Sequence, residues 1–136
     1  MIDKQICLDL ERLKRLNMVE AVWGENKSCE QIIHILKQLN AAKQLALVTR
    51  VDEGKALKLL DVFEDAEYHQ NSECLTLGDS ISIDPSLGEV LIVSGGTSDF
   101  KVASEAALSL RLHGIKAELL MDVGVAGIHR LLNNLD

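Results

Sequence analysis

A short run of small and hydroxyl-bearing residues, Ser94–Asp99, follows the apolar stretch Glu89–Val93 and precedes a helical pattern. Glycines in such a turn let the backbone approach a ligand, and the first N–H groups of a helix bind anions. The hydroxyls of Thr97 and Ser98 add donors, and the Asp99 carboxylate can accept hydrogen bonds from ribose. The run therefore predicts a phosphate site, although a plain strand-to-helix turn with a serine cap explains it about as well.

A second run, Asp122–Arg130, follows the next predicted strand. The carboxyl ends of neighbouring parallel strands open onto one crevice, so both runs should face the same volume. His129 can move a proton near neutral pH, Arg130 can hold phosphate with its planar fork, and Gly127 keeps the approach open. A His-Arg pair alone is more often solvated surface, but the two runs together predict a pocket for a nucleotide monophosphate.

The sequence around these two runs alternates between strand and helix patterns. Glu89–Val93 is an uninterrupted apolar strand of the kind that is buried on both faces in a parallel sheet, and Gly114 is a helix stop signal. The βαβα order implies right-handed parallel crossovers. We predict a strand at 89–93, a helix at 99–113, a strand at 115–121 and a helix at 125–135 that is interrupted only by Gly127.

The first half of the chain is also α/β. Ser28 and Gln31 have the spacing of a capping box, and Asp52 can cap a further helix. Residues 79–88 contain the only proline and read as a linker, which predicts domains at 1–78 and 89–136. The predicted elements of the first half are a helix at 3–16, a strand at 18–23, a helix from Ser28, a strand at 45–48, a helix from Asp52 and short strands near Tyr68 and at 74–77.

Composition excludes several classes of protein. Lys and Arg number 14 against 21 Asp and Glu, and the net charge of −7 disfavours binding to nucleic acid or anionic membranes. Aromatic residues are only 3% of the chain, which leaves few surfaces for base stacking. No secretion signal or membrane-spanning stretch is visible, and Cys7, Cys29 and Cys74 form no CxxC pair, so we expect a soluble cytoplasmic protein.

Together these segments resemble a known family. Gly96–Asp99, Val102-Ala103, Glu105–Ala107 and above all the Asp122–Arg130 sequence Asp-Val-Gly-Val-Ala-Gly-Ile-His-Arg are similar to LarB, the nickel-pincer-cofactor synthase, in the wider superfamily of the purine carboxylase and mutase PurE. The similarity runs from about Val19 onward. It implies a small N-terminal α/β domain followed by the first two βα units of a PurE-like, flavodoxin-like parallel three-layer domain.

The resemblance also implies an activity. LarB enzymes carboxylate the pyridinium ring of nicotinic acid adenine dinucleotide and hydrolyse its phosphoanhydride, giving pyridinium-3,5-biscarboxylate mononucleotide and AMP. We accordingly expect CO2 or bicarbonate as co-substrate, Mg²⁺ as the metal with no ligands assigned, no tightly bound organic cofactor, and a homo-oligomer. The substrate partner would be the dinucleotide or a related mononucleotide.

Site residues follow from the same resemblance. Ser98 and Arg130 would hold the phosphate, Asp99 the ribose hydroxyls, and His129 would lie beside the ring being carboxylated. Lys27 and Arg50, which follow two predicted strands, are candidates for contacts to a second phosphate. The phosphate and ribose set comprises Gly96, Thr97, Ser98, Asp99, Gly127 and Arg130.

Two departures bear on the assignment. PurE enzymes carry serine where this chain has Gly96 and Gly127, which favours LarB over a purine-biosynthetic aminoimidazole ribonucleotide carboxylase or mutase. Both families continue further, and none of the three cysteines matches the one that LarB is thought to use on the pyridinium. We therefore expect an N-terminal portion that is inactive alone. A non-catalytic binding or assembly module is the remaining alternative.

Overall fold

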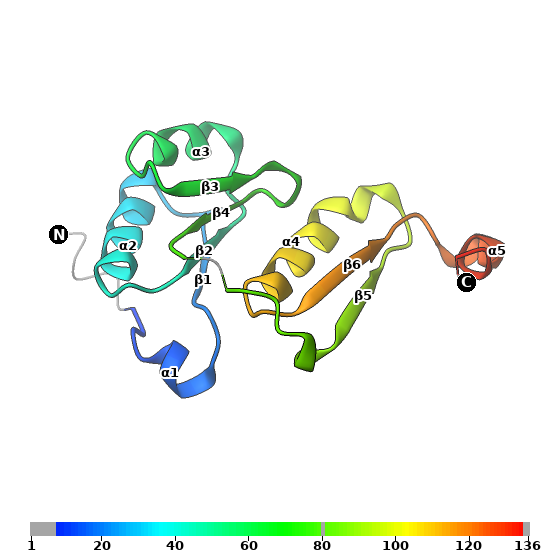
Figure 1. Ribbon diagram of the computed structural model, residues 1–136. Coiled ribbons are helices and arrows are strands. Elements are labelled where there is room, and N and C mark those ends of the chain that lie inside the picture. Colours follow the sequence, from blue (N-terminus) through cyan, green and yellow to red (C-terminus); the bar gives the residue numbers. More distant parts are fainter. Residues whose placement is uncertain (1–7, 80, 135–136) are drawn as a thin grey trace. The chain divides into compact units, whose positions relative to one another are not determined.

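The computed structural model describes residues 8–79 and 81–134. The chain is mixed α/β, as the sequence predicts, and it divides into two compact units, Met1–Ser80 and Ile81–Asp136 (Figure 1). Among the described residues, no helix is long and apolar enough to cross a membrane.

The first unit is built on a four-stranded sheet in the order β1-β2-β4-β3. Strands β1 and β2 are parallel, whereas β4 pairs antiparallel with both β2 and β3. Its strands are β1 (Ala21–Trp23), β2 (Ala46–Thr49), β3 (Ala66–His69) and β4 (Cys74–Leu77), and its helices are α1 (Arg12–Leu16), α2 (Cys29–Ala41) and α3 (Glu53–Leu60). The buried core joins α2 and α3 to these strands through Ile32, Ile35, Leu36, Leu39, Val48, Ala56, Leu59 and Leu75.

The two longer helices of this unit begin where their caps predict. The Ser28 hydroxyl accepts from the Gln31 N–H at 3.2 Å, and the Gln31 side-chain oxygen accepts from the Ser28 N–H at 2.9 Å, so the predicted capping box is confirmed. The Asp52 carboxylate accepts from the Lys55 N–H at 2.9 Å at the start of α3. Each cap occupies backbone donors that the helix leaves without partners, which is worth about 1 kcal/mol.

The helix predicted at 3–16 is shorter than expected. Within the described residues it begins only at Arg12, where Glu11 makes no side-chain cap, and Asn17 ends it in the left-handed conformation at φ 53°. Residues 1–7, which include Ile6 and Cys7 of the prediction, lie outside the described residues. Without a cap, apolar spacing alone did not fix the start of the helix.

The second unit contains two parallel strands, β5 (Glu89–Val93) and β6 (Lys116–Leu120), with Val90 opposite Ala117 and Ile92 opposite Leu119. Helix α4 (Phe100–Arg111) packs against both strands and buries Ala103 and Ala107. Small side chains allow this close packing. The helix ends at Arg111, two residues before the predicted end at 113, and Gly114 follows at φ +77°.

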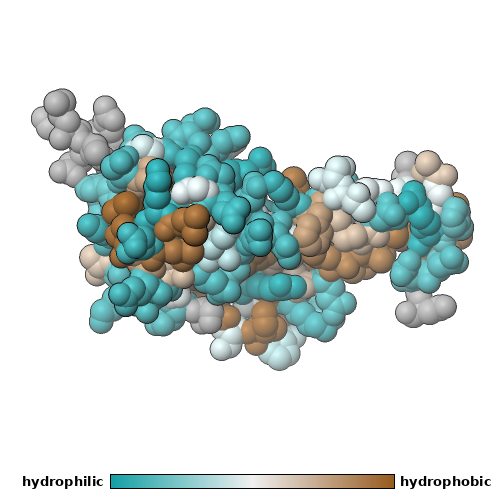
Figure 2. Space-filling view, turned by 90° about the horizontal axis from the view of Figure 1, so that it is seen from above, coloured by the Kyte–Doolittle hydropathy of each residue, from teal (hydrophilic) through white to brown (hydrophobic). Residues whose placement is uncertain are grey.

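The prediction that β5 is buried on both faces is wrong. Leu91 is 55% exposed and Val93 is 51% exposed, and alternation along a strand points both away from the face that carries Ile92. Helix α4 packs on this two-stranded sheet. Apolar residues are nevertheless exposed on the second unit, where they appear as brown areas in Figure 2. An apolar run predicts a strand but does not show that both of its faces are covered.

The last predicted helix is also corrected. Residues Val125–Gly127 form a short 3-10 turn, and the α-helix itself, α5, spans Ile128–Leu132. Gly127, the last residue of this turn, separates it from α5, as its position in the pattern suggested, and its φ of −139° and ψ of 69° are not helical. Leu135 lies outside the described residues.

Candidate functional site

The two glycine-containing bends of the second unit lie against each other. The Ser94 N–H donates to the Leu120 carbonyl at 2.9 Å, and the Val123 N–H donates to the Ser94 carbonyl at 3.0 Å. Next to these bonds, a Cβ placed on Gly124 would lie 2.6 Å from the Gly95 carbonyl oxygen, a distance that real side chains do not adopt. The carboxyl ends of β5 and β6 are therefore joined, and only glycine fits at 124.

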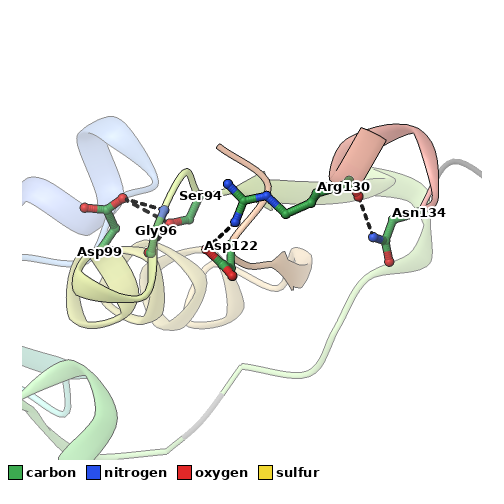
Figure 3. Close-up of polar contacts among 6 residues, drawn as sticks. All are labelled: Ser94, Gly96, Asp99, Asp122, Arg130 and Asn134. Carbon is green, nitrogen blue, oxygen red and sulfur yellow. Dashed lines mark hydrogen bonds and ion pairs between the residues drawn. The ribbon is translucent and has the colours of Figure 1, made fainter. Parts of the chain in front are cut away.

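In the first bend, the Asp99 carboxylate contacts Ser94 and Gly96, which precede it in the same bend. Its Oδ2 accepts from the Gly96 N–H at 3.3 Å and lies 3.2 Å from the Ser94 hydroxyl, which also lies 3.0 Å from the Gly96 carbonyl oxygen (Figure 3). Ser94 is only 6% exposed. Thr97 and Ser98 are exposed on the short 3-10 turn that leads into α4. The Gly96 N–H, predicted as an anion donor, is thus already bonded to Asp99 in this arrangement.

The second bend carries an ion pair. Asp122 follows β6 in the left-handed conformation, at φ 60°, which L-residues other than Asn and Asp rarely adopt. Arg130 of α5 extends back over the bend, and its Nη1 lies 2.9 Å from Oδ1 of Asp122 (Figure 3). Its Nη2 would be 3.5 Å from a Cβ on Gly124. The guanidinium is therefore held next to the point where the two bends touch.

Gly127 gives room to both candidate side chains of α5. A Cβ at 127 would lie 3.0 Å from His129 Cε1 and 3.1 Å from Arg130 Nε, so a side chain there would displace one of them. Gly96 differs, because its nearest neighbour would be the Ser98 hydroxyl at 3.8 Å. A serine is thus accommodated at 96 but not at 127 with the present side-chain positions.

The residues predicted to bind the first phosphate and the ribose and to transfer the proton lie in the second unit, on or beside these bends. His129 is exposed and Arg130 half-buried. Sequence reasoning assigned no role to Ser94 or Asp122. The available signals were the position of Ser94 directly after an apolar strand and the position of Asp122 at the turn that carries Arg130.

Lys27 and Arg50, the candidates for a second phosphate, belong to the first unit. They lie in the bends after β1 and β2, which are joined by a 2.8 Å bond from the Gly24 N–H to the Thr49 carbonyl. The Lys55 ammonium steadies the first of these bends by donating to the carbonyls of Gly24 at 2.9 Å and of Glu25 at 2.7 Å. The role of Lys27 and Arg50 stays a prediction.

The described parts of the chain hold no group of three or more His, Cys, Asp or Glu residues placed to bind a metal ion. Mg²⁺ commonly keeps several waters and uses one or two carboxylates together with substrate phosphates. Asp99 and Asp122 are the carboxylates of the candidate site, and both already accept hydrogen bonds.

Comparison with known proteins decides the family. Residues 4–79, more than half of the chain, match the LarB/PurE-like N-terminal domain. The chain belongs to the LarB/PurE-like family. The resemblance predicted from the sequence is thereby confirmed, and the mixed α/β fold agrees with it.

A relative extends the similarity of this LarB/PurE-like chain into the second unit. The uncharacterized protein MJ0165 of Methanocaldococcus jannaschii is 31% identical over 137 residues, which cover 96% of this chain and 53% of the relative. The chain therefore spans about half the length of the curated relative that it matches. The family match ends at residue 79, whereas the candidate site lies in the stretch that only the relative covers.

Proposed function

We propose that the second unit contributes a mononucleotide-binding site to a LarB-type synthase. The enzyme would carboxylate the pyridinium ring of nicotinic acid adenine dinucleotide and hydrolyse the phosphoanhydride. The observation that supports this most is the approach of Gly124 to Gly95, which places the Asp99 and Arg130 bends together at the carboxyl ends of two parallel strands. Ligands of open α/β sheets bind in this position.

The phosphate would be held by Arg130 and Ser98. A guanidinium has five N–H donors, so Arg130 can bind Asp122 and still offer donors to phosphate oxygens. The exposed Ser98 hydroxyl adds a further donor. Asp99 uses Oδ2 for its contacts with Ser94 and Gly96, which leaves Oδ1 to accept from a ribose hydroxyl.

The chemistry would take place beside His129. Carboxylation forms a carbon–carbon bond between the ring and CO2 and releases the ring proton, which the exposed imidazole of His129 would accept. Hydrolysis adds water across the phosphoanhydride and releases AMP and the mononucleotide. The proposal includes CO2 or bicarbonate as co-substrate, Mg²⁺ bound mainly through substrate phosphate and water, and a homo-oligomeric enzyme.

The glycine at 127 favours this reaction over purine chemistry. A serine there, as in the PurE pattern, would place its Cβ about 3 Å from the side chains of His129 and Arg130 and would require them to shift by a few tenths of an ångström. With glycine at both 96 and 127, the site lacks two of the hydroxyls with which the purine enzymes are expected to hold phosphate. Binding of the pyridinium nucleotide would then depend more strongly on Arg130.

The test uses the full-length product of the gene that encodes this chain. The protein is incubated with nicotinic acid adenine dinucleotide, Mg²⁺ and ¹³C-bicarbonate, and the products are separated and weighed by mass spectrometry. We expect AMP and a mononucleotide that has gained labelled carboxylate, and neither product with the Arg130→Gln variant. Absence of AMP from the wild-type reaction, or conversion of aminoimidazole ribonucleotide instead, would remove the proposal.

A further inference from the structure

The backbone of Asp122 is held by the structured residues that precede and follow it in the second unit. Its own backbone follows β6, and the next residue, Val123, donates its N–H to the Ser94 carbonyl at 3.0 Å. Its left-handed φ of 60° turns the chain sharply at this point. The backbone that carries the Asp122 carboxylate is therefore anchored, although the side chain itself is 55% exposed.

Arg130 reaches Asp122 from α5. Its side chain is 39% exposed, and the contact with Asp122 at 2.9 Å crosses the whole bend from α5 to the end of β6. An arginine side chain has many rotamers, and binding a ligand with a mobile guanidinium costs the freedom that is lost. A guanidinium that is already bonded through Nη1 has fewer orientations open to its other N–H groups than a free one.

Orientation matters here because net charge does not attract an anion. The chain carries a net charge of −7, and the candidate site holds the carboxylates of Asp99 and Asp122 against the single guanidinium of Arg130. A phosphate must therefore be recognised by directed hydrogen bonds rather than by a positive field. The alignment of these hydrogen bonds depends on the orientation of the Arg130 guanidinium that donates them.

We propose that Asp122 is a positioning residue that aims the guanidinium of Arg130 at a phosphate monoester. The proposal rests on the proposed function for the identity of the ligand. It makes a counterintuitive claim, namely that a negative charge beside an anion site strengthens anion binding. If Asp122 acted only through its charge, its removal would relieve repulsion and tighten binding, so the two roles predict changes of opposite sign.

Two substitutions separate the carboxylate from the backbone turn. Asp122→Gly removes the carboxylate, and glycine adopts φ 60° without strain. Asp122→Asn also tolerates this conformation and keeps an oxygen that can accept from Arg130. A matched control is Glu118→Gln, which alters another exposed ion pair of β6, the 3.2 Å contact of Glu118 with Lys116.

The first measurement is the affinity of the full-length protein for nicotinic acid mononucleotide by calorimetry at fixed ionic strength. We expect Asp122→Gly to bind about tenfold more weakly, the loss typical of one hydrogen bond to a charged group, and Asp122→Asn to recover part of it. Glu118→Gln should bind like the wild type. Unchanged or tighter binding by Asp122→Gly would overturn the positioning role.

A second measurement does not depend on the nucleotide. Rotation about the Nε–Cζ bond of Arg130, followed by ¹⁵N NMR, should be slow in the wild type and faster in Asp122→Gly, with equal thermal unfolding temperatures as the check on folding. Equal rotation rates in the two proteins would overturn the inference. If the wild type bound no mononucleotide, the proposed function would fail, and the rotation rates would still decide whether Asp122 holds Arg130.

Discussion

The carbonyl oxygen of Gly95 lies so close to Gly124 that a Cβ on Gly124 would be only 2.6 Å away. This contact joins the turn after β5 to the turn after β6, and it brings the residues predicted for phosphate and ribose to one edge of the sheet. Glycine at 124 is required by this neighbour and not by its own backbone, since its φ is −57°.

Gly124→Ala should therefore separate the two bends. Overpacking of this kind costs about 1–3 kcal/mol, and we expect lower thermal stability of the second unit and weaker binding of nicotinic acid mononucleotide. Gly95→Ala is the matched control, because its Cβ would meet the Gly124 Cα at an ordinary 3.7 Å. Thermal unfolding and calorimetry measure both effects, and equal behaviour of the two variants would contradict the contact.

Ser94→Ala should loosen Asp99. The buried Ser94 hydroxyl lies 3.2 Å from the Asp99 carboxylate, and its loss should cost about 1 kcal/mol and weaken binding of the mononucleotide more than binding of inorganic phosphate. Ser104→Ala in α4 is the control, since the Ser104 hydroxyl is buried and has no hydrogen-bond partner within the described residues. Its removal should be neutral or stabilising. A Ser94→Ala protein with unchanged binding would show that Asp99 needs no support.

Gly24→Ala should destabilise the first unit. Its Cβ would lie 2.9 Å from the Thr49 carbonyl oxygen and 3.0 Å from Val48 Cγ1, both in or beside the core strand β2. We expect a loss of about 1–3 kcal/mol in the free energy of unfolding by urea. Gly54→Ala, in the first turn of α3, meets only the Asp52 carboxylate at 3.3 Å and should change stability little or raise it. Similar losses in both variants would argue against close packing at Gly24.

Much of this architecture follows from the sequence, for identifiable reasons. Ser28 with Gln31, and Asp52, mark helix starts because their partners lie three residues away, within reach of local rules. The exposure of Leu91 depends on what packs on the far face of β5, which an apolar run does not record. The Asp122–Arg130 pair crosses a bend and follows no fixed spacing rule, so only the fold reveals it.

The single tyrosine offers a pH probe of the first unit. Partial burial raises the pKa of Tyr68, helped by the negative charges of Glu73, Glu53 and Asp52, and its hydroxyl donates to the Val51 carbonyl at 2.9 Å. A raised pKa in the folded state means that the neutral phenol stabilises the fold below the unfolded pKa of about 10 and that this contribution is lost at higher pH. As the pH is raised, tyrosinate absorbance should appear at a higher pH in the folded than in the urea-unfolded protein. Coincident titrations would contradict this environment.

The proposed function requires that the bends at 95–99 and 124–130 form one phosphate-binding site. The most direct test is a titration of the ¹⁵N-labelled full-length protein with nicotinic acid mononucleotide, followed through the backbone amide shifts. We predict shifts in both bends that saturate with one dissociation constant, together with a shift of the Arg130 Nε–H signal. Shifts confined to one bend, or two different dissociation constants, would contradict a shared site.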